Sequence, residues 1–409
     1  MFKRNVESKL KKALSRSPVV LLTGPRQCGK TTLMKEVAQN DGYHFVTFDN
    51  IATMAAAKND PMGFIKNLQK PVIIDEVQRV PEIFLAIKLD VDENRVSGRY
   101  ALTGSSNIFL IPKLGDSLAG RMEIIDLYPL SQGEIHGKVD SFIDIVFEGK
   151  IPDFQQISRE NLLQRMEIGG YPTVQDKDEE DRIAWIESYI NTLLERDIKD
   201  LSQISGFLEL PKLLHMIAAR SGSLVNFSDL SRTSGIPSST LQRYIALLDT
   251  IYLIHSQHAW SSNIGNRAIK SPKIYLIDTG ILSYLVGATS KNRFLNTFIG
   301  SLFETFVVNE ILKQITWNKT RVKMYHLRMH SGSEVDIILE NAQSEIVGIE
   351  VKSSTTVSPR DFNGLKNLSE HLGVKFLKGF VLYNGDAIIP FGDKIFAIPM
   401  SCLWSETFL

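Results

Sequence analysis

The chain has 409 residues, of which 43% are hydrophobic, and its 46 Lys and Arg residues balance 46 Asp and Glu residues to a formal net charge of zero. The length exceeds one typical domain core, and the neutral balance excludes a polycation that binds nucleic acid over its whole surface. The only two cysteines, Cys28 and Cys402, are too few for a disulfide framework or a cysteine-ligated metal cluster.

The first predicted element is a strand–loop–helix unit whose loop, residues 24–31, fits the phosphate-binding pattern G-x-x-x-x-G-K-[ST]. Loop amides and the N-terminus of the following helix together cradle phosphates. We therefore expect ATP to bind here, with Lys30 on the β- and γ-phosphates and the Thr31 hydroxyl on Mg²⁺. The residues expected to contact the nucleotide are Gly24, Pro25, Arg26, Gln27, Cys28, Gly29, Lys30, Thr31 and Thr32.

A second part of the nucleotide site is predicted where an apolar strand at residues 72–75 ends in two carboxylates, Asp75 and Glu76. Ligands of parallel sheets bind at the carboxyl ends of the strands. Asp75 is therefore expected beside the Mg²⁺ that Thr31 holds, and Glu76 is expected to orient and activate the attacking water. Alternating strands and helices up to about residue 130 favour a parallel, doubly wound α/β sheet.

The next predicted strand, residues 100–103, runs into a polar turn. Ser105, Ser106 or Asn107 could hydrogen-bond the γ-phosphate or the attacking water, and the sequence does not choose among them. For any one of these residues, a helix N-cap is an equally good interpretation. Ser105 is the residue that we assign to the catalytic set.

Arg121 follows at the end of a predicted helix, before a strand at residues 122–127. An arginine at this position can reach the nucleotide of a neighbouring subunit and stabilise the transition state. That role requires a homo-oligomer, which we therefore expect. The alternative interpretation is a helix C-terminal cation that the helix dipole favours.

Helices are expected to dominate beyond Pro129, and residues 226–248 show a helix-turn-helix pattern. Segments 252–254 and 273–277 could pair as the strands of a wing. DNA is accordingly one expected partner. The second helix of the motif offers Arg243 but few other cations, so a packing or oligomerisation module is an equally good interpretation.

A second possible chemistry is predicted from two consecutive strands between residues 333 and 352. Adjacent strands can bring Asp336 and Glu350 together, and Lys352 lies on the same face as Glu350 because strand side chains repeat every two residues. Two carboxylates can bind Mg²⁺ or Mn²⁺, Lys352 can orient a water, and Glu304 on the preceding helix could add a carboxylate. A salt-bridged sheet face without metal is the alternative.

Together these motifs resemble the AAA-type P-loop ATPases, and within them a large prokaryotic group of uncharacterised function. The segments that carry the resemblance are LTGPRQ at 22–27, LTGS at 102–105, SLAGR at 117–121, GGYP at 169–172, ERDI at 195–198 and EVKSS at 350–354. In that group a winged-helix region and a domain resembling PD-(D/E)xK nucleases follow the ATPase core. Here Val335 stands where the proline of that name would be.

The resemblance covers nearly the whole chain and implies three domains. These are an AAA-type P-loop ATPase domain at residues 1–130, a helical and winged-helix region at 131–290, and an α/β restriction-endonuclease-like domain at 291–409. We expect a cytoplasmic protein without a membrane partner, because the sequence shows neither a signal peptide nor an apolar run of membrane-spanning length.

Two classes of function follow from these predictions. The first is a Mg²⁺-dependent ATPase that acts on nucleic acid through its nuclease-like domain. The second is a nucleotide-gated assembly or interaction protein whose C-terminal domain is an inactive binding scaffold. The presence of Asp336, Glu350 and Lys352 together favours the first class, whereas the neutral charge balance favours the second.

Overall fold

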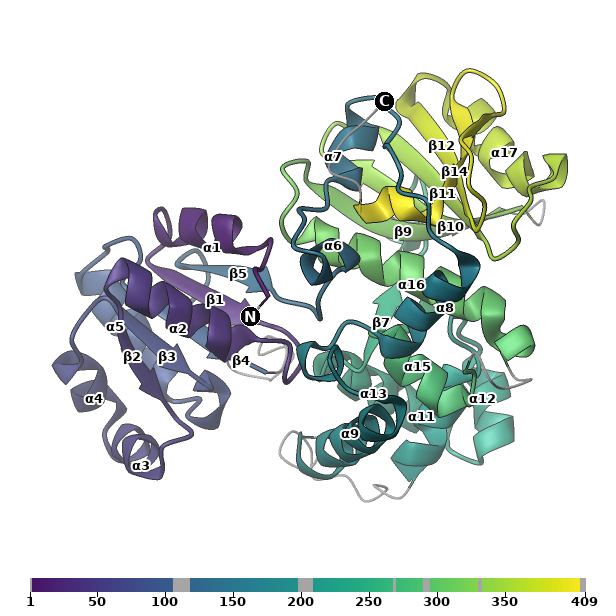
Figure 1. Ribbon diagram of the computed structural model, residues 1–409. Helices are drawn as coiled ribbons and strands as arrows, with labels where there is room; N and C mark the ends of the chain where they lie inside the picture. The colour runs from purple at the N-terminus through teal and green to yellow at the C-terminus, as the bar shows by residue number, and fades with distance from the viewer. Residues whose placement is uncertain are drawn as a thin grey trace. The chain divides into compact units, whose positions relative to one another are not determined.

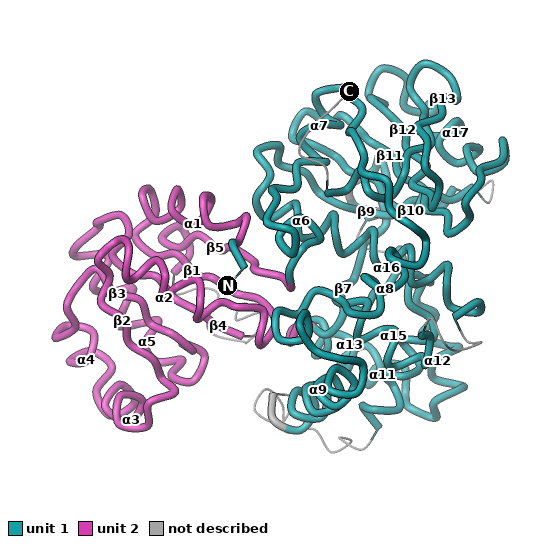
Figure 2. The backbone as a smooth tube through the Cα atoms, in the orientation of Figure 1, with its two compact units in different colours: residues 1–3, 130–249, 253–409 teal, residues 4–129, 250–252 magenta. Residues whose placement is uncertain are grey.

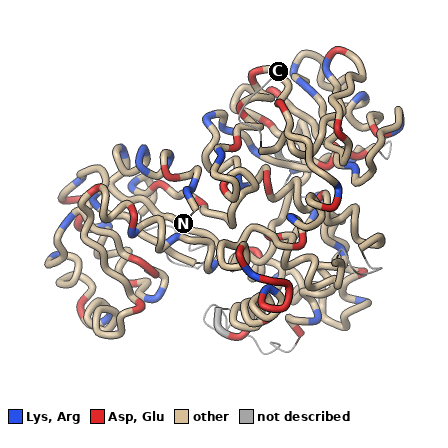
Figure 3. Tube along the Cα trace, in the orientation of Figure 1, with Lys and Arg blue, Asp and Glu red and all other residues tan. Residues whose placement is uncertain are grey.

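The computed structural model describes residues 2–105, 118–197, 209–267, 270–289, 295–329 and 333–404. Two compact units divide the chain (Figure 2): a smaller one of residues 4–129 with 250–252, and a larger one of residues 1–3, 130–249 and 253–409. Both units carry basic as well as acidic residues (Figure 3). Across the described residues, no helix combines the length and apolar character needed to cross a membrane.

The smaller unit is built on a five-stranded sheet in the order β2-β3-β4-β1-β5, and all of its strand pairs are parallel. Its strands are β1 (Val19–Thr23), β2 (His44–Thr47), β3 (Val72–Asp75), β4 (Tyr100–Gly104) and β5 (Met122–Asp126). The central strands β1, β3 and β4 are buried along their whole length, which suits continuous apolar runs covered on both faces. The predicted parallel sheet is therefore confirmed.

Helices cover both faces of this sheet (Figure 1). They are α1 (Glu7–Leu14), α2 (Lys30–Asp41), α3 (Ile51–Asn59), α4 (Pro61–Asn67) and α5 (Ile83–Glu93). Apolar side chains of α1 and α2 share one core with Val20 and Leu22 of β1, whereas those of α3, α4 and α5 share another with Val19 and Leu21. The alternation of side chains along β1 thus joins two cores through one strand.

The larger unit begins with helices and a small antiparallel sheet in the order β6-β8-β7. Its helices are α6 (Gln132–Ile135), α7 (Phe142–Phe147), α8 (Arg159–Ile168), α9 (Glu179–Thr192), α11 (Leu210–Ala218), α12 (Phe227–Ser234), α13 (Ser238–Thr250), α14 (Ile264–Arg267), α15 (Thr279–Val286) and α16 (Leu295–Ile315). The strands are β6 (Ser223–Leu224), β7 (Ile254–Gln257) and β8 (Lys273–Leu276).

The helix-turn-helix segment forms the two helices α12 and α13 that its pattern predicts. The apolar face of α13 is buried through Leu241, Ile245 and Leu248, and Arg243 is exposed. The second wing segment contains β8, which pairs with β7, but β7 begins only at Ile254, the last residue of the first predicted segment at 252–254.

A mixed six-stranded sheet completes the larger unit, in the order β13-β14-β12-β11-β10-β9. Its elements are β9 (Val322–Arg328), β10 (Glu334–Asn341), β11 (Ile346–Lys352), α17 (Asn363–Leu372), β12 (Phe376–Tyr383), β13 (Ile389–Pro390) and β14 (Ile395–Pro399). β10 and β11 run antiparallel, with Ile337 opposite Ile349. This register places Asp336 across from Glu350, as the sequence predicted.

Candidate nucleotide site and C-terminal carboxylate cluster

The predicted phosphate loop connects the carboxyl end of β1 to the first residue of α2. Gly24 has a φ of 143° and Gly29 a φ of 103°, a region that favours glycine. A Cβ on Gly24 would lie 2.1 Å from the carbonyl oxygen of Leu127, so this position has no room for a side chain. Both glycines of the motif are thus required by the geometry of the loop.

Lys30 is buried within this loop, with 5% of its surface exposed. Its ammonium donates to the carbonyl oxygens of Gly24, at 2.9 Å, and Pro25, at 2.6 Å. Arg4, which precedes α1, connects the loop to the segment after β5. Its guanidinium donates to the carbonyl oxygens of Cys28, at 2.6 Å, and Tyr128, at 2.7 Å. The lysine is therefore positioned at the loop that phosphates would enter. Thr32, the last predicted contact, is exposed on α2.

Asp75 and Thr31 are brought together, as the sequence predicted for a Mg²⁺ site. The Thr31 hydroxyl donates to Asp75 Oδ1 at 3.0 Å. Thr103 also donates to Oδ1, and Thr47 donates to Oδ2 at 3.3 Å. Asp75 is 2% exposed. A hydroxyl and a carboxylate side by side are the hard oxygen donors that Mg²⁺ takes, so the residues present fit this ion.

Glu76 takes a strained conformation directly after β3, with a φ of 57°. Its backbone N–H donates to Thr103 Oγ1 at 3.1 Å. The Gln78 side-chain amide donates both to the Glu76 carboxylate and, at 2.9 Å, to the Ser105 hydroxyl. Ser105, which directly follows β4, is thus linked to Glu76 through the Gln78 side chain. The alternatives Ser106 and Asn107 lie outside the described residues.

Gln78 is a site residue that the sequence analysis missed. It lies in the short turn Val77–Arg79 after the paired carboxylates, and this turn directs its amide back toward Glu76. Its side-chain oxygen is buried without a hydrogen-bond partner among the described residues. The sequence signal that could have indicated Gln78 is a polar residue two positions after Glu76.

Tyr252 is a second residue that sequence reasoning did not find. Its hydroxyl donates to Asp126 at 2.8 Å and lies 3.3 Å from the Thr23 hydroxyl, at the carboxyl ends of β5 and β1. Burial raises the pKa of Asp126, and burial together with the Asp126 charge raises the pKa of Tyr252. Tyr252 is far from the phosphate loop in sequence, so no local pattern indicates this contact.

Arg121 lies at the amino-terminal end of β5. The phosphate loop follows the carboxyl end of the parallel strand β1, so the two lie at opposite ends of the strands. Its guanidinium pairs with Asp92 and donates to the carbonyl oxygen of Ala119 at 3.1 Å. Within one subunit it is therefore not directed at the nucleotide site. The predicted role toward a neighbouring subunit stays a prediction.

The C-terminal carboxylates lie around a lysine that the sequence analysis did not assign to them. Lys273, on β8, places its ammonium 2.8 Å from Glu304 and 3.0 Å from Asp336. Tyr275 donates to Glu304 at 2.7 Å. Lys352 pairs with Glu350 at 2.8 Å. Because Lys273 belongs to a different sheet, sequence spacing could not place it here.

The pKa values of several side chains in this cluster are shifted from their usual range. Burial, with the Asp336 charge, raises the pKa of Glu304 to about 7 and that of Glu350 to about 8. Burial alone would lower the pKa of Lys273, but Asp336 and Glu304 together raise it. Among the described residues, no group of three or more His, Cys, Asp or Glu side chains is arranged to hold a metal ion. Lys273 thus neutralises carboxylates that were predicted to bind Mg²⁺ or Mn²⁺.

Models of three protein families match the chain. They describe an AAA domain at residues 16–136, a domain of unknown function (DUF8612) at 159–292 and another (DUF4143) at 299–403. None of the three describes a nuclease. The chain is therefore a P-loop ATPase-like protein whose AAA domain precedes two domains without an assigned role.

Three similar curated proteins are themselves uncharacterized. One from Mycobacterium tuberculosis and one from Mycobacterium bovis are each 30% identical over 400 residues, which cover 97% of this chain and 83% of the relative. One from Haemophilus influenzae is 23% identical over 379 residues, which cover 86% of this chain and 87% of the relative.

Solved structures give weaker similarities. The Walker-type ATPase of Pyrococcus abyssi is 15% identical, with 70% of this chain and 96% of that chain covered and a TM-score of 0.42. The RuvB Holliday junction branch migration motor of Thermotoga maritima is 20% identical, with 61% and 88% covered and a TM-score of 0.29. With TM-scores this low, neither structure supports an argument about function.

Proposed function

The chain belongs to the same family as the two uncharacterized mycobacterial proteins, and we propose that it is a Mg²⁺-dependent ATP hydrolase. One observation supports this proposal above the others. The Thr31 hydroxyl lies 3.0 Å from the Asp75 carboxylate, beside a loop that holds Lys30. Phosphoryl transfer needs this arrangement of a cationic phosphate ligand and oxygen donors for the metal.

Each residue has a separate task in the proposed reaction. The loop amides and Lys30 bind the β- and γ-phosphates, and Thr31 and Asp75 hold Mg²⁺, which neutralises charge on the phosphate oxygens. Glu76 accepts a proton from the attacking water. Gln78 and Ser105 hold the Glu76 carboxylate in place through the hydrogen bonds described above.

Replacement of Lys30 by Ala tests the binding part of this proposal. The loss of one charge-assisted contact with phosphate is expected to weaken ATP binding by at least about tenfold. Isothermal titration of the full chain with ATP and Mg²⁺ measures this effect. Lys58→Ala, an exposed lysine on α3 of the same unit, is the matched control and should bind ATP as wild type does. Equal ATP affinity of the two variants would show that Lys30 does not contribute to ATP binding.

For the C-terminal domain we propose the second function class, a binding scaffold and not a metal-dependent nuclease. The contacts of Lys273 favour this choice, because an ammonium held between Glu304 and Asp336 supplies the positive charge that a metal would otherwise provide. DNA remains a proposed partner of the helix-turn-helix segment, where Arg243 is exposed on α13. Self-association also remains a proposal.

A plasmid-nicking assay with Mg²⁺ or Mn²⁺, with and without ATP, separates the two classes. The full chain is expected to leave the plasmid intact under all of these conditions. Asp336→Asn and the exposed control Asp386→Asn should then behave alike. Cleavage by wild type and by Asp386→Asn that disappears in Asp336→Asn would show a nuclease and contradict the scaffold proposal.

A further inference from the structure

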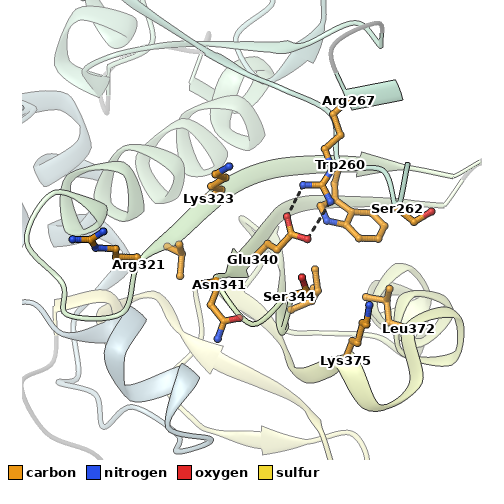
Figure 4. A pocket seen from close by; sticks show the side chains of 13 residues that line it. Trp260, Ser262, Arg267, Arg321, Lys323, Glu340, Asn341, Ser344, Leu372 and Lys375 are labelled. Carbon is orange, nitrogen blue, oxygen red and sulfur yellow. Dashed lines mark hydrogen bonds and ion pairs between the residues drawn. The ribbon is translucent and has the colours of Figure 1, made fainter. Parts of the chain in front are cut away.

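A pocket of about 530 Å³ lies beside the β10–β11 hairpin in the larger unit (Figure 4). Its wall includes Glu340 near the end of β10 and Ile346 at the start of β11. Asp336 lies near the other end of β10, so the pocket is separate from the carboxylate cluster. Its size falls within the range of small-molecule sites, roughly 300–1,000 Å³.

One wall of the pocket is held rigidly by Arg267. Its guanidinium forms two contacts with Glu340, at 2.5 and 3.0 Å, and donates to the Tyr325 hydroxyl at 3.2 Å and to the Ser261 carbonyl oxygen at 2.6 Å. It also lies 5.4 Å from the ring centre of Trp260 and 4.9 Å from that of Tyr325. Glu340, the only carboxylate among the described residues that line the pocket, is thereby neutralised.

Three further cations lie around the same pocket: Arg321, Lys323 and Lys375 (Figure 4). All three are exposed, and within the part of the chain that the structure describes none of them has an ion-pair partner within 4.0 Å. With Glu340 already paired, the pocket has an excess of about three positive charges. The pocket therefore carries a local positive excess on a chain whose formal net charge is zero.

The pocket also offers apolar surface. Val322, Ile346 and Leu372 line it. A ligand that matches these groups has an anionic end and a largely apolar body.

We propose that this pocket binds a nucleoside phosphate. The phosphate is held by Arg321, Lys323 and Lys375, and the base packs against Val322 and Leu372. This site is independent of the phosphate loop, which lies in the smaller unit. A free mononucleotide and a nucleotide at the end of a strand present the same chemistry, and the experiment distinguishes these two sources.

The test uses the full chain in the Lys30→Ala background, so that the phosphate loop contributes little, and AMP as the probe in isothermal titration. AMP should bind, and Lys323→Gln should weaken it about tenfold, because a charge-assisted hydrogen bond is lost. Lys366→Gln, which removes an exposed lysine on α17 outside the pocket, should leave the affinity unchanged. No AMP binding, or equal affinities in Lys323→Gln and Lys366→Gln, would overturn the proposal.

Three other probes define the ligand. Adenosine and inorganic phosphate each lack half of the proposed contacts and should bind at least about tenfold more weakly than AMP. If inorganic phosphate binds as tightly as AMP, the apolar residues of the pocket do not contact the base as proposed. The third probe is a short single-stranded oligonucleotide with a terminal phosphate. If it binds more tightly than AMP, and if Lys323→Gln removes this difference in affinity, the natural ligand is the end of a strand. Weaker binding of the oligonucleotide would support a free nucleotide.

Discussion

Replacement of Glu76 by Gln is expected to leave ATP binding nearly unchanged and to slow hydrolysis by about 10²–10⁴-fold. Gln keeps the size of Glu and one oxygen that can still accept from Gln78, but it cannot take a proton from the attacking water. Binding should survive because the phosphate contacts come from the loop and Lys30, which Glu76 does not touch. Titration with ATP and phosphate release by the same purified protein measure the two effects separately.

The control for this variant is Glu93→Gln, which changes an exposed glutamate at the end of α5 in the same unit. It should bind and hydrolyse ATP as wild type does. Gln78→Ala should slow turnover to a smaller extent than Glu76→Gln, because it loosens the carboxylate without removing it. Undiminished turnover in Glu76→Gln would remove the proposed base from the mechanism.

Replacement of Arg121 by Ala is expected to reduce turnover by on the order of 10³-fold if this residue acts on the nucleotide of a neighbouring subunit. Arg121 lies at the amino-terminal end of β5, away from the phosphate loop of its own subunit, and this position agrees with a role between subunits. Specific activity should then rise with protein concentration. Mixing Arg121→Ala with Lys30→Ala should partly restore turnover, since each protein supplies the group that the other lacks.

Asp92→Asn is the matched control, because it breaks the ion pair of Arg121 while keeping the guanidinium. If Arg121 acts between subunits, Asp92→Asn should retain most of the activity. If Arg121 only stabilises the fold through Asp92, the two variants should lose the same free energy of unfolding and the same activity. Full activity of a protein that stays monomeric at every concentration would rule out the role between subunits.

The features that sequence predicted correctly are local ones. The spacing of Gly24, Gly29 and Lys30 reflects a loop in which a side chain on Gly24 would meet the backbone of Leu127. The parallel sheet follows from short apolar runs that are buried on both faces, and β8 forms within the segment 273–277 that was expected to be a strand.

The features that sequence missed join distant segments. Tyr252 reaches Thr23 and Asp126, and Lys273 reaches Glu304 and Asp336 on other elements. Periodicity along one element indicates which face is buried, but not which side chain from another element will meet it. The sequence therefore did not indicate Lys273 beside Asp336, because it gives no distance between Asp336 and a lysine more than sixty residues earlier.

Steady-state phosphate release by the full chain, with ATP and Mg²⁺ and beside Lys30→Ala at the same concentration, tests the central claim most directly. The proposed mechanism predicts release by wild type that stops when EDTA removes Mg²⁺ and that falls to background in Lys30→Ala. Release that persists at the wild-type rate in EDTA or in Lys30→Ala, or its absence from well-folded wild type over the full range of protein concentration, would contradict it.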